Sequence, residues 1–349
     1  MMTRIVIVSA RVGAGHDGAA YALAERLVHH DVEVLDFLDL LPRSLGRRLC
    51  GLYHRQLEVA PRSWDWTLRA LGTAGPAWLA ARAATLACDR LRAVLGDGPD
   101  LAISTYPLAT HALGALRARG ALTAPLAVYL TDPSVHRLCV SGIADLHLAP
   151  NQNAATQALV WGARQVDVAA PLVRARFGPA TTAERARARQ QFGLPPTGRL
   201  ALAVAGSWGV GQLAETACDV AASGVAVPVV VCGRNTALRD QLLAAGHPHV
   251  FGWVEDMPRL MHAVDVVVQN AGGLTTSEAL AAGLPVVTYR CLPGHGRANA
   301  DVLDRIGVVP WIRSAADLAS TLAADRPTAV AAVPAGDPVP LLEKLLDVA

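Results

Sequence analysis

The chain has 349 residues, which is long for one α/β domain and suits two. Hydrophobic residues make up 52% of it, enough for two buried cores, and the formal net charge of +2 argues against a protein that coats nucleic acid. Its six cysteines are scattered without CxxC spacing or paired histidines, so we expect neither a zinc site nor a disulfide framework.

The N-terminus leads straight into an apolar strand rather than into the basic start of a signal peptide. The most apolar long window, residues 70–88, is interrupted by Arg82, so no membrane-spanning helix is expected. We therefore expect a cytoplasmic protein, either free in solution or peripheral on the cytoplasmic face of the cell membrane.

Short apolar runs alternate with helical patterns along the chain, as in parallel α/β folds. In the first half, strands are predicted at residues 4–8, 32–35, 101–104, 126–130 and 145–148. In the second half, they are predicted at residues 200–205, 227–231, 249–251, 266–269 and 285–288. This repetition predicts two Rossmann-like domains, residues 1–167 and 168–325, and the second opens with a helix at 184–191.

Two segments depart from this alternation. Residues 42–95 are helical in pattern and lack the strand that an ordinary Rossmann repeat would have there. Residues 327–340 are rich in Ala, Pro and Gly, and residues 341–348 return to a helical pattern. We expect residues 326–349 to form a linker and a C-terminal helix that packs back on the N-terminal domain.

A glycine-containing turn follows the first predicted strand and opens a helix predicted at residues 17–28. Gly13 and Gly15 let the backbone approach a ligand, and the helix N-terminus behind them supplies unpaired N–H groups. The positive end of the helix disfavours the charged form of His16, which keeps a neutral base available. The alternative is that the glycines only shape a tight turn and His16 lies at the surface.

The helical segment 42–95 is strongly basic. It contains nine arginines and three acidic residues, hence a net charge of +6, and it includes Tyr53, Trp64, Trp66 and Trp78. Basic helices with Trp and Leu suit the headgroup zone of an anionic bilayer. The alternative is a helical subdomain with its tryptophans in the core and its arginines in solvent.

The most specific pattern lies in the second half. The strand at 266–269 ends in a turn containing Gly272 and Gly273 that opens a helix, which is the layout of an anion-binding site. The next strand ends in a loop at residues 293–299. Ligands of such sheets bind at the carboxyl ends of the strands, where both loops lie.

The helix after this turn carries side chains that suit a nucleotide. Thr275 and Thr276 place hydroxyls beside the free N–H groups, as a diphosphate requires. Glu278 lies about one turn further along, where a carboxylate can accept both hydroxyls of a ribose.

Residues 251–307 resemble the donor domain of the monogalactosyldiacylglycerol synthase and processive diacylglycerol glucosyltransferase group. They are more distantly similar to the N-acetylglucosaminyltransferase that makes lipid II. Residues 104–107, 131–136 and 231–235 and the His16 loop resemble the same family. The resemblance implies an α/β GT-B fold, with two Rossmann-like domains facing each other across a cleft. It also implies a UDP-sugar donor and inversion at the anomeric carbon, with no metal or other cofactor required.

Carried over residue by residue, the resemblance implies a donor site for the diphosphate, uracil, ribose and sugar. The residues assigned to it are Gly15, Gly206, Ser207, Arg234, Phe251, Trp253, Met257, Asn270, Gly272, Gly273, Leu274, Thr275, Thr276, Glu278, Pro293, Gly294, His295 and Asn299.

His16 falls where the family has its base. Asp132 also follows a strand of the first domain, so we expect it to orient His16 or to contact the acceptor. The alternative is an aspartate that only shapes the turn before Pro133. His136 is expected to be structural or to line the acceptor cleft rather than to act as a second base.

Two departures from the family pattern bear on specificity. The family's Gln-Glu after Pro-Gly is replaced by His295 and Gly296, so the donor stays open among UDP-glucose, UDP-galactose and UDP-N-acetylglucosamine. Cys139 stands where the family commonly has tryptophan, which leaves the acceptor open.

The sequence thus predicts an inverting hexosyltransferase of glycolipid biosynthesis that moves a hexose from a UDP-sugar to a hydroxyl acceptor, foremost a lipid such as diacylglycerol. Its expected partners are the nucleotide-sugar donor, a lipid or small-molecule acceptor and an anionic membrane surface, with no nucleic acid. The alternatives are a soluble natural-product acceptor, a non-hydrolysing UDP-sugar epimerase and a non-enzymatic nucleotide-sugar sensor. An epimerase needs further carboxylates that His295 and Gly296 do not supply, and His16 with Glu278 argues against a sensor.

Overall fold

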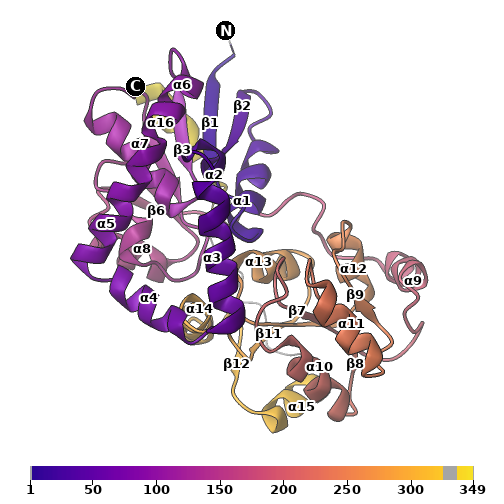
Figure 1. The fold of residues 1–349 in the computed structure, drawn as a ribbon. Helices are drawn as coiled ribbons and strands as arrows, with labels where there is room; N and C mark the ends of the chain where they lie inside the picture. The colour runs from indigo at the N-terminus through magenta and orange to yellow at the C-terminus, as the bar shows by residue number, and fades with distance from the viewer. Residues whose placement is uncertain (1, 325–335, 349) are drawn as a thin grey trace. The chain divides into compact units, whose positions relative to one another are not determined.

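The computed structural model describes residues 2–324 and 336–348, and the chain divides into two units. Unit 1 contains residues 2–56, 62–172 and 336–348, and unit 2 contains residues 57–61 and 173–324. Each unit is a parallel sheet covered by helices (Figure 1).

The sheet of unit 1 has six parallel strands in the order β2-β1-β3-β4-β5-β6. They are β1 (Arg4–Ser9), β2 (Asp31–Asp36), β3 (Leu101–Ser104), β4 (Leu126–Tyr129), β5 (Leu146–Ala149) and β6 (Val166–Val168). The strand order reverses between β1 and β3, and ligands of such sheets bind at this kind of switch point. The first five strands confirm the prediction, whereas β6 was missed because three half-buried residues at a sheet edge give no apolar run.

The helices of unit 1 follow the strands along the chain. They are α1 (Gly15–Ala24), α2 (Phe37–Leu40), α3 (Leu45–Val59), α4 (Ser63–Leu71), α5 (Ala74–Ala84), α6 (Cys88–Leu95), α7 (Pro107–Ala118), α8 (Gln152–Val160) and α16 (Pro338–Val348), with 3-10 turns η1 (Thr85–Ala87) and η2 (Arg137–Cys139). Residues 42–95 are therefore helical without a strand, as the sequence predicts. None of the helices in the described part of the chain is both long and apolar enough to cross a bilayer.

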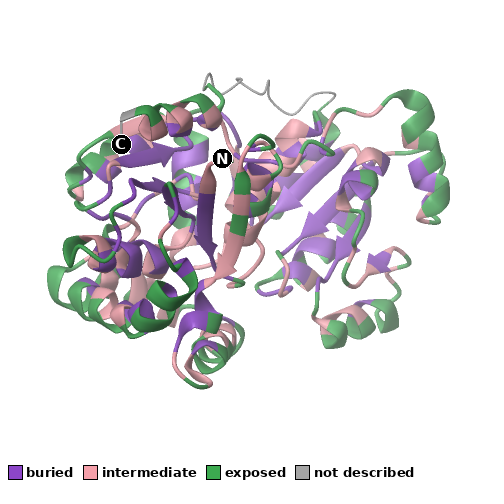
Figure 2. Cartoon of the chain, turned by 90° about the horizontal axis from the view of Figure 1, so that it is seen from above, coloured by how far each residue is buried: buried purple, intermediate pink, exposed green. Residues whose placement is uncertain are grey.

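Both faces of the unit 1 sheet are buried. Alternate residues of a strand face opposite sides, and accordingly Val6 and Val8 lie in one apolar cluster while Ile5 and Ile7 lie in another. Figure 2 shows the same pattern, with largely buried strands and exposed outer helix faces. This explains why the strands of this sheet read as continuous apolar runs in the sequence.

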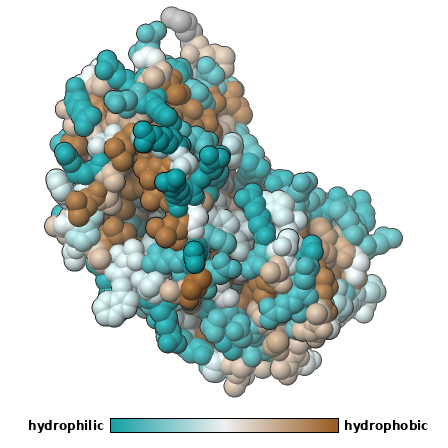
Figure 3. Space-filling model, in the orientation of Figure 1, coloured by the Kyte–Doolittle hydropathy of each residue, from teal (hydrophilic) through white to brown (hydrophobic). Residues whose placement is uncertain are grey.

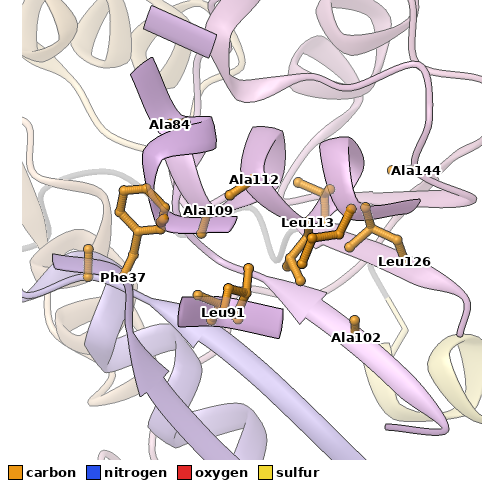
Figure 4. Close-up of a cluster of buried hydrophobic side chains, with 14 of the residues drawn as sticks. Phe37, Ala84, Leu91, Ala102, Ala109, Ala112, Leu113, Leu126 and Ala144 are labelled. Carbon is orange, nitrogen blue, oxygen red and sulfur yellow. The ribbon is translucent and has the colours of Figure 1, made fainter. Parts of the chain in front are cut away.

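The last part of the helical segment 42–95 packs into the apolar cluster that contains Val6 and Val8. Ala84 of α5 and Leu91 of α6 pack with Leu113 of α7 over the sheet, and Phe37 joins them (Figure 4). Each fully buried leucine contributes roughly 2 kcal/mol to folding. The end of the segment is therefore core.

The C-terminal helix packs in unit 1. The N–H of Ala170 donates to the carbonyl of Gly336 at 2.9 Å, and Leu342 of α16 is fully buried in the cluster that contains Leu23 and Leu27 of the first domain. Of the expected linker, residues 326–335 lie outside the described part of the chain.

The sheet of unit 2 also has six parallel strands, in the order β12-β11-β10-β7-β8-β9. They are β7 (Leu200–Val204), β8 (Val227–Val231), β9 (Val250–Phe251), β10 (Val266–Gln269), β11 (Val286–Tyr289) and β12 (Trp311–Ile312). The order reverses between β7 and β10, so the loops after these two strands flank the switch point. Five strands confirm the prediction, and β12 was missed because two residues at an edge carry no pattern.

The helices of unit 2 are α9 (Thr182–Gln191), α10 (Leu213–Ala222), α11 (Thr236–Ala244), α12 (Met257–Ala263), α13 (Gly273–Ala281), α14 (His295–Arg305) and α15 (Ala315–Ala323). The first of them begins earlier than predicted. The side chain of Thr181 accepts from the N–H of Glu184 and Glu184 reaches back to Thr181, a capping box that starts the helix at Thr182.

Candidate functional site

His16 lies in the first turn of α1, which begins at Gly15 directly after the loop that follows β1. Its Nδ1 lies 2.6 Å from the carbonyl oxygen of Thr105, beyond β3, and 3.2 Å from the hydroxyl oxygen of Thr131, beyond β4. Because a carbonyl only accepts, Nδ1 carries the proton of the neutral ring and donates it to Thr105. The lone pair is therefore on Nε2, which can act as a base.

Burial is the main influence on the charge of His16. It lowers the pKa of the imidazole below its usual value, while the negative charge of Asp132 and the hydrogen bond to Thr105 act in the opposite direction. The neutral ring was expected from the positive end of the helix, but the larger cause is loss of solvation.

The orientation of the His16 ring is fixed by its hydrogen bond to Thr105. Nδ1 is bonded to the Thr105 carbonyl, so the influence of Asp132 on the ring is electrostatic. That Asp132 helps to orient His16 or contacts the acceptor stays a prediction. His136 lies beside Cys139, with Nε2 3.4 Å from Sγ, and burial raises the pKa of that thiol to about 12, so it stays protonated.

Aromatic rings lie around His16 in unit 1. The ring of Tyr106 meets His16 edge-on at 5.2 Å, and Phe37 lies 5.8 Å beyond Tyr106. Tyr53 of α3 and Trp64 of α4 contact each other at 4.6 Å, and the pKa of Tyr53 is raised by burial and by the nearby charge of Asp132. These aromatic contacts pack the part of unit 1 in which the His16 ring lies.

In unit 2, the start of α13 has the layout of an anion site. Gly272 is the N-cap residue and no side chain caps the helix, so the first N–H groups, from Gly273 onward, have no acceptor within the helix. Thr275 is half-buried on this turn. The hydroxyl of Thr276 was expected to face a diphosphate. In the structure Thr276 is only 2% exposed, and its hydroxyl donates to the Gly272 carbonyl at 2.8 Å.

The loops after β7 and β8 interlock. The N–H of Arg234 donates to the carbonyl of Ser207 at 2.9 Å, and the amide of Asn235 donates to the carbonyl of Gly209 at 3.2 Å. At Gly233, with φ +58°, a Cβ atom would clash with the Ser207 carbonyl, so only glycine fits. The loop that contains Gly206 and Ser207 is thereby fixed beside the switch point.

The loops after β7 and β10 are tied by Asn270. Its side-chain amide donates to the carbonyl of Val210 at 3.1 Å. Asn270 therefore holds the two loops at the switch point together. The resemblance had assigned it to the donor site.

Glu278 projects from α13 near two arginines. Burial raises the pKa of its carboxyl group to about 8, and the charges of Arg176 and Arg174 oppose this shift. Strongly shifted groups mark functional sites more often than chance. Neither arginine could be assigned from the sequence, because both lie outside the motifs and about a hundred positions before Glu278.

An exposed tryptophan lies two residues after β9. Trp253 is 50% exposed, and the guanidinium of Arg234 lies over its ring at 4.8 Å. A flat aromatic face of this kind can stack on a nucleobase. Phe251, predicted beside it, is half-buried and packs edge-on against Phe192 at 5.7 Å, while Met257 begins α12.

The loop after β11 leads into α14. Gly294, with φ +75°, is its N-cap residue, Pro293 precedes it and His295 is the first helical residue. Asn299 is fully buried and donates from Nδ2 to the carbonyl of Ala271 at 3.3 Å. Asn299 was expected to contact the donor sugar or phosphate, and in the structure it instead bonds the turn before α13.

Comparison with known proteins agrees with this geometry. Residues 16–170 match the family profile described as monogalactosyldiacylglycerol (MGDG) synthase, and residues 198–324 match that of glycosyl transferases group 1. A processive diacylglycerol beta-glucosyltransferase of Bacillus cereus (strain B4264) is 26% identical, with 89% of this chain and 82% of the relative covered. The enzyme of the same name from Bacillus cytotoxicus is 25% identical, with 90% and 83% covered.

Solved structures share the fold over the whole chain. Acinetobacter baumannii MurG has a TM-score of 0.58 at 16% identity, covering 100% of this chain and 99% of that one. Anabaena Alr3699/HepE, solved in complex with UDP and glucose, has a TM-score of 0.56 at 18% identity with the same coverage. The chain is therefore a glycosyltransferase of the GT-B fold, and its sequence is similar to monogalactosyldiacylglycerol synthase and to the processive diacylglycerol glucosyltransferases.

Proposed function

We propose that this enzyme moves a hexose from a UDP-sugar to a hydroxyl group of a lipid such as diacylglycerol, with inversion at the anomeric carbon. In this proposal residues 1–167 bind the acceptor and residues 168–325 bind the donor. The observation that carries it is the uncapped start of α13, which leaves N–H groups for a diphosphate, with the Glu278 carboxyl on the same helix for a ribose. The nucleotide is proposed as UDP because Alr3699/HepE, of the same fold, was solved with UDP and glucose.

In the proposed mechanism His16 takes the proton of the acceptor, and the start of α13 stabilises the leaving UDP. The acceptor oxygen attacks the anomeric carbon from the face opposite UDP and loses its proton to Nε2 of His16, which carries the lone pair. The bond between the anomeric carbon and the phosphate oxygen breaks as the new glycosidic bond forms. The N–H groups at Gly273 and beyond stabilise the charge that grows on the leaving diphosphate.

The acceptor is proposed as a lipid because the two relatives named above are diacylglycerol glucosyltransferases. The helices of unit 1 also carry exposed tryptophans, Trp66 at 71% on α4 and Trp78 at 59% on α5. Each has an arginine over its ring, Arg69 at 5.7 Å and Arg82 at 5.5 Å. Apolar side chains also lie exposed among hydrophilic ones over the unit 1 helices in Figure 3. This combination suits an anionic headgroup layer, and we place the enzyme on the cytoplasmic face of the membrane.

The membrane contact predicts binding to anionic vesicles. The protein should co-sediment with liposomes containing phosphatidylglycerol, and added salt should weaken the binding because arginines supply part of it. Replacing Trp66 and Trp78 together by alanine should weaken it severalfold. Trp311→Ala is the matched control, since Trp311 also lies under an arginine, Arg313, but belongs to unit 2. Equal sedimentation of the double variant and wild type would remove these tryptophans from the membrane contact.

The donor and acceptor can be tested together by measuring UDP release. UDP-glucose, UDP-galactose and UDP-N-acetylglucosamine are each offered with diacylglycerol in vesicles and with soluble aglycones. We expect release with at least one donor that depends on the lipid, and a product of inverted anomeric configuration by NMR. Turnover of soluble aglycones alone would replace the lipid acceptor, and conversion of the UDP-sugar to its epimer without any acceptor would replace the transfer reaction.

A further inference from the structure

The turn before α13 contains a residue in an unfavourable backbone conformation. Ala271 has φ +77°, in the left-handed region that side chains other than glycine rarely adopt. It is 1% exposed and immediately precedes Gly272, the N-cap residue of α13. Such a conformation persists only where surrounding contacts enforce it.

Two buried amide side chains supply those contacts. Oε1 of Gln269, which is 2% exposed, accepts hydrogen bonds from the N–H of Ala271 and, at 2.8 Å, from the N–H of Gly272. On the other side, Nδ2 of the fully buried Asn299 donates to the carbonyl of Ala271 at 3.3 Å. The Gln269 amide is itself fixed, because its Nε2 donates to the hydroxyl of Thr288 on β11 at 2.9 Å.

Gln269 is the one polar residue of β10, whose other residues are Val266, Val267 and Val268. A leucine there would fill similar space, so packing alone gives no reason for an amide. Burying an amide is costly unless its groups are bonded. The groups that bond it belong to the turn and to Thr288, which indicates that the amide serves the turn.

We propose that Gln269 and Asn299 are positioning residues for the donor: they hold Ala271 in its left-handed conformation and so aim the open N-terminus of α13 at the diphosphate. This inference rests on the proposed function. Because Asn299 lies on α14, which begins at His295, the same clamp links the turn before α13 to the helix that carries the proposed sugar-binding residue. The clamp touches no substrate atom in this account.

The test measures UDP affinity by calorimetry alongside thermal unfolding. Gln269→Leu removes the one oxygen that accepts from both N–H groups, so the turn can relax, and UDP Kd should rise about tenfold in the folded protein. Adding Ala271→Gly to Gln269→Leu should recover part of the affinity, because glycine re-enters the left-handed region without strain.

Gln157→Leu is the matched control. It likewise removes a glutamine oxygen that accepts a backbone hydrogen bond, at 2.7 Å from the N–H of Val135, but in unit 1. It should lower Tm without changing UDP Kd. If Gln269→Leu also lowers Tm but leaves UDP Kd within about twofold of wild type, the residue is only structural and the inference is wrong. If wild type binds no UDP, the donor proposal fails instead, and the same variants are compared with the nucleotide that does bind among ADP, GDP and dTDP.

Discussion

Replacing His16 by alanine is expected to lower kcat by about two orders of magnitude or more, with UDP affinity nearly unchanged. The ring is held through Nδ1 by Thr105, which leaves Nε2 as the base, and no other described side chain is assigned this proton. UDP affinity is spared because the proposed nucleotide site lies in unit 2. Single-turnover rates and UDP calorimetry on the same preparation check both halves of the prediction.

The pH dependence of kcat gives a second readout for His16. Burial lowers the pKa of its imidazole, so the ring stays neutral below the usual value of 6.5. Activity should therefore hold as the pH falls to that value and decline only below it. His111→Asn is the matched control, since His111 is another half-buried unit 1 histidine bonded to a carbonyl, Leu138, at 3.0 Å. An equal loss of kcat in both variants, or lost UDP binding in His16→Ala, would mean that His16 is not the base.

Replacing Glu278 by glutamine is expected to raise the UDP Kd and the donor KM by about tenfold or more, since hydrogen bonds to a charged group are strong. The pKa of about 8 adds a pH signature. In the free enzyme this carboxyl is largely protonated at neutral pH, and its ionised form accepts both ribose hydroxyls. UDP affinity of wild type should therefore increase as the pH rises through about 8, and the variant should lack this increase.

As the pH rises, the stability of the wild-type protein should fall while its affinity for UDP increases. A carboxyl whose pKa is raised from 4.5 to about 8 contributes stability at low pH, and that contribution is lost as the pH rises through the folded value. Glu278→Gln carries no charge, so it should melt above wild type at pH 9 and close to it at pH 4.5. Glu215→Gln, an exposed carboxyl on α10, is the control for both measurements. If the UDP affinity of wild type did not change with pH, Glu278 would not be the residue that binds the ribose.

Helices and strands could be predicted from the sequence where they have apolar runs or follow glycine-containing turns. The strand cores, the helical segment 42–95 and the start of α13 all carry such patterns. The edge strands β6 and β12 do not, because an edge position with few paired residues selects no apolar alternation. The capping box at Thr181 was present in the sequence but was not used to place the helix start.

The side chains at the site were harder to assign because polar residues near a motif look alike in sequence. Asn299 and Thr276 both read as ligand contacts, yet they are buried and bond the backbone around Gly272. Gln269 read as the last residue of a strand, although its role depends on the left-handed conformation of Ala271. The approach of Arg174 and Arg176 to Glu278 depends on tertiary structure alone.

A crystal structure of the enzyme with UDP is the decisive measurement. We expect the phosphate nearer the sugar position to accept hydrogen bonds from N–H groups at Gly273, Leu274 and Thr275, and the ribose hydroxyls to bond Glu278. Nucleotide bound elsewhere on the protein, with the first turn of α13 free of phosphate, would contradict the donor site and the mechanism built on it.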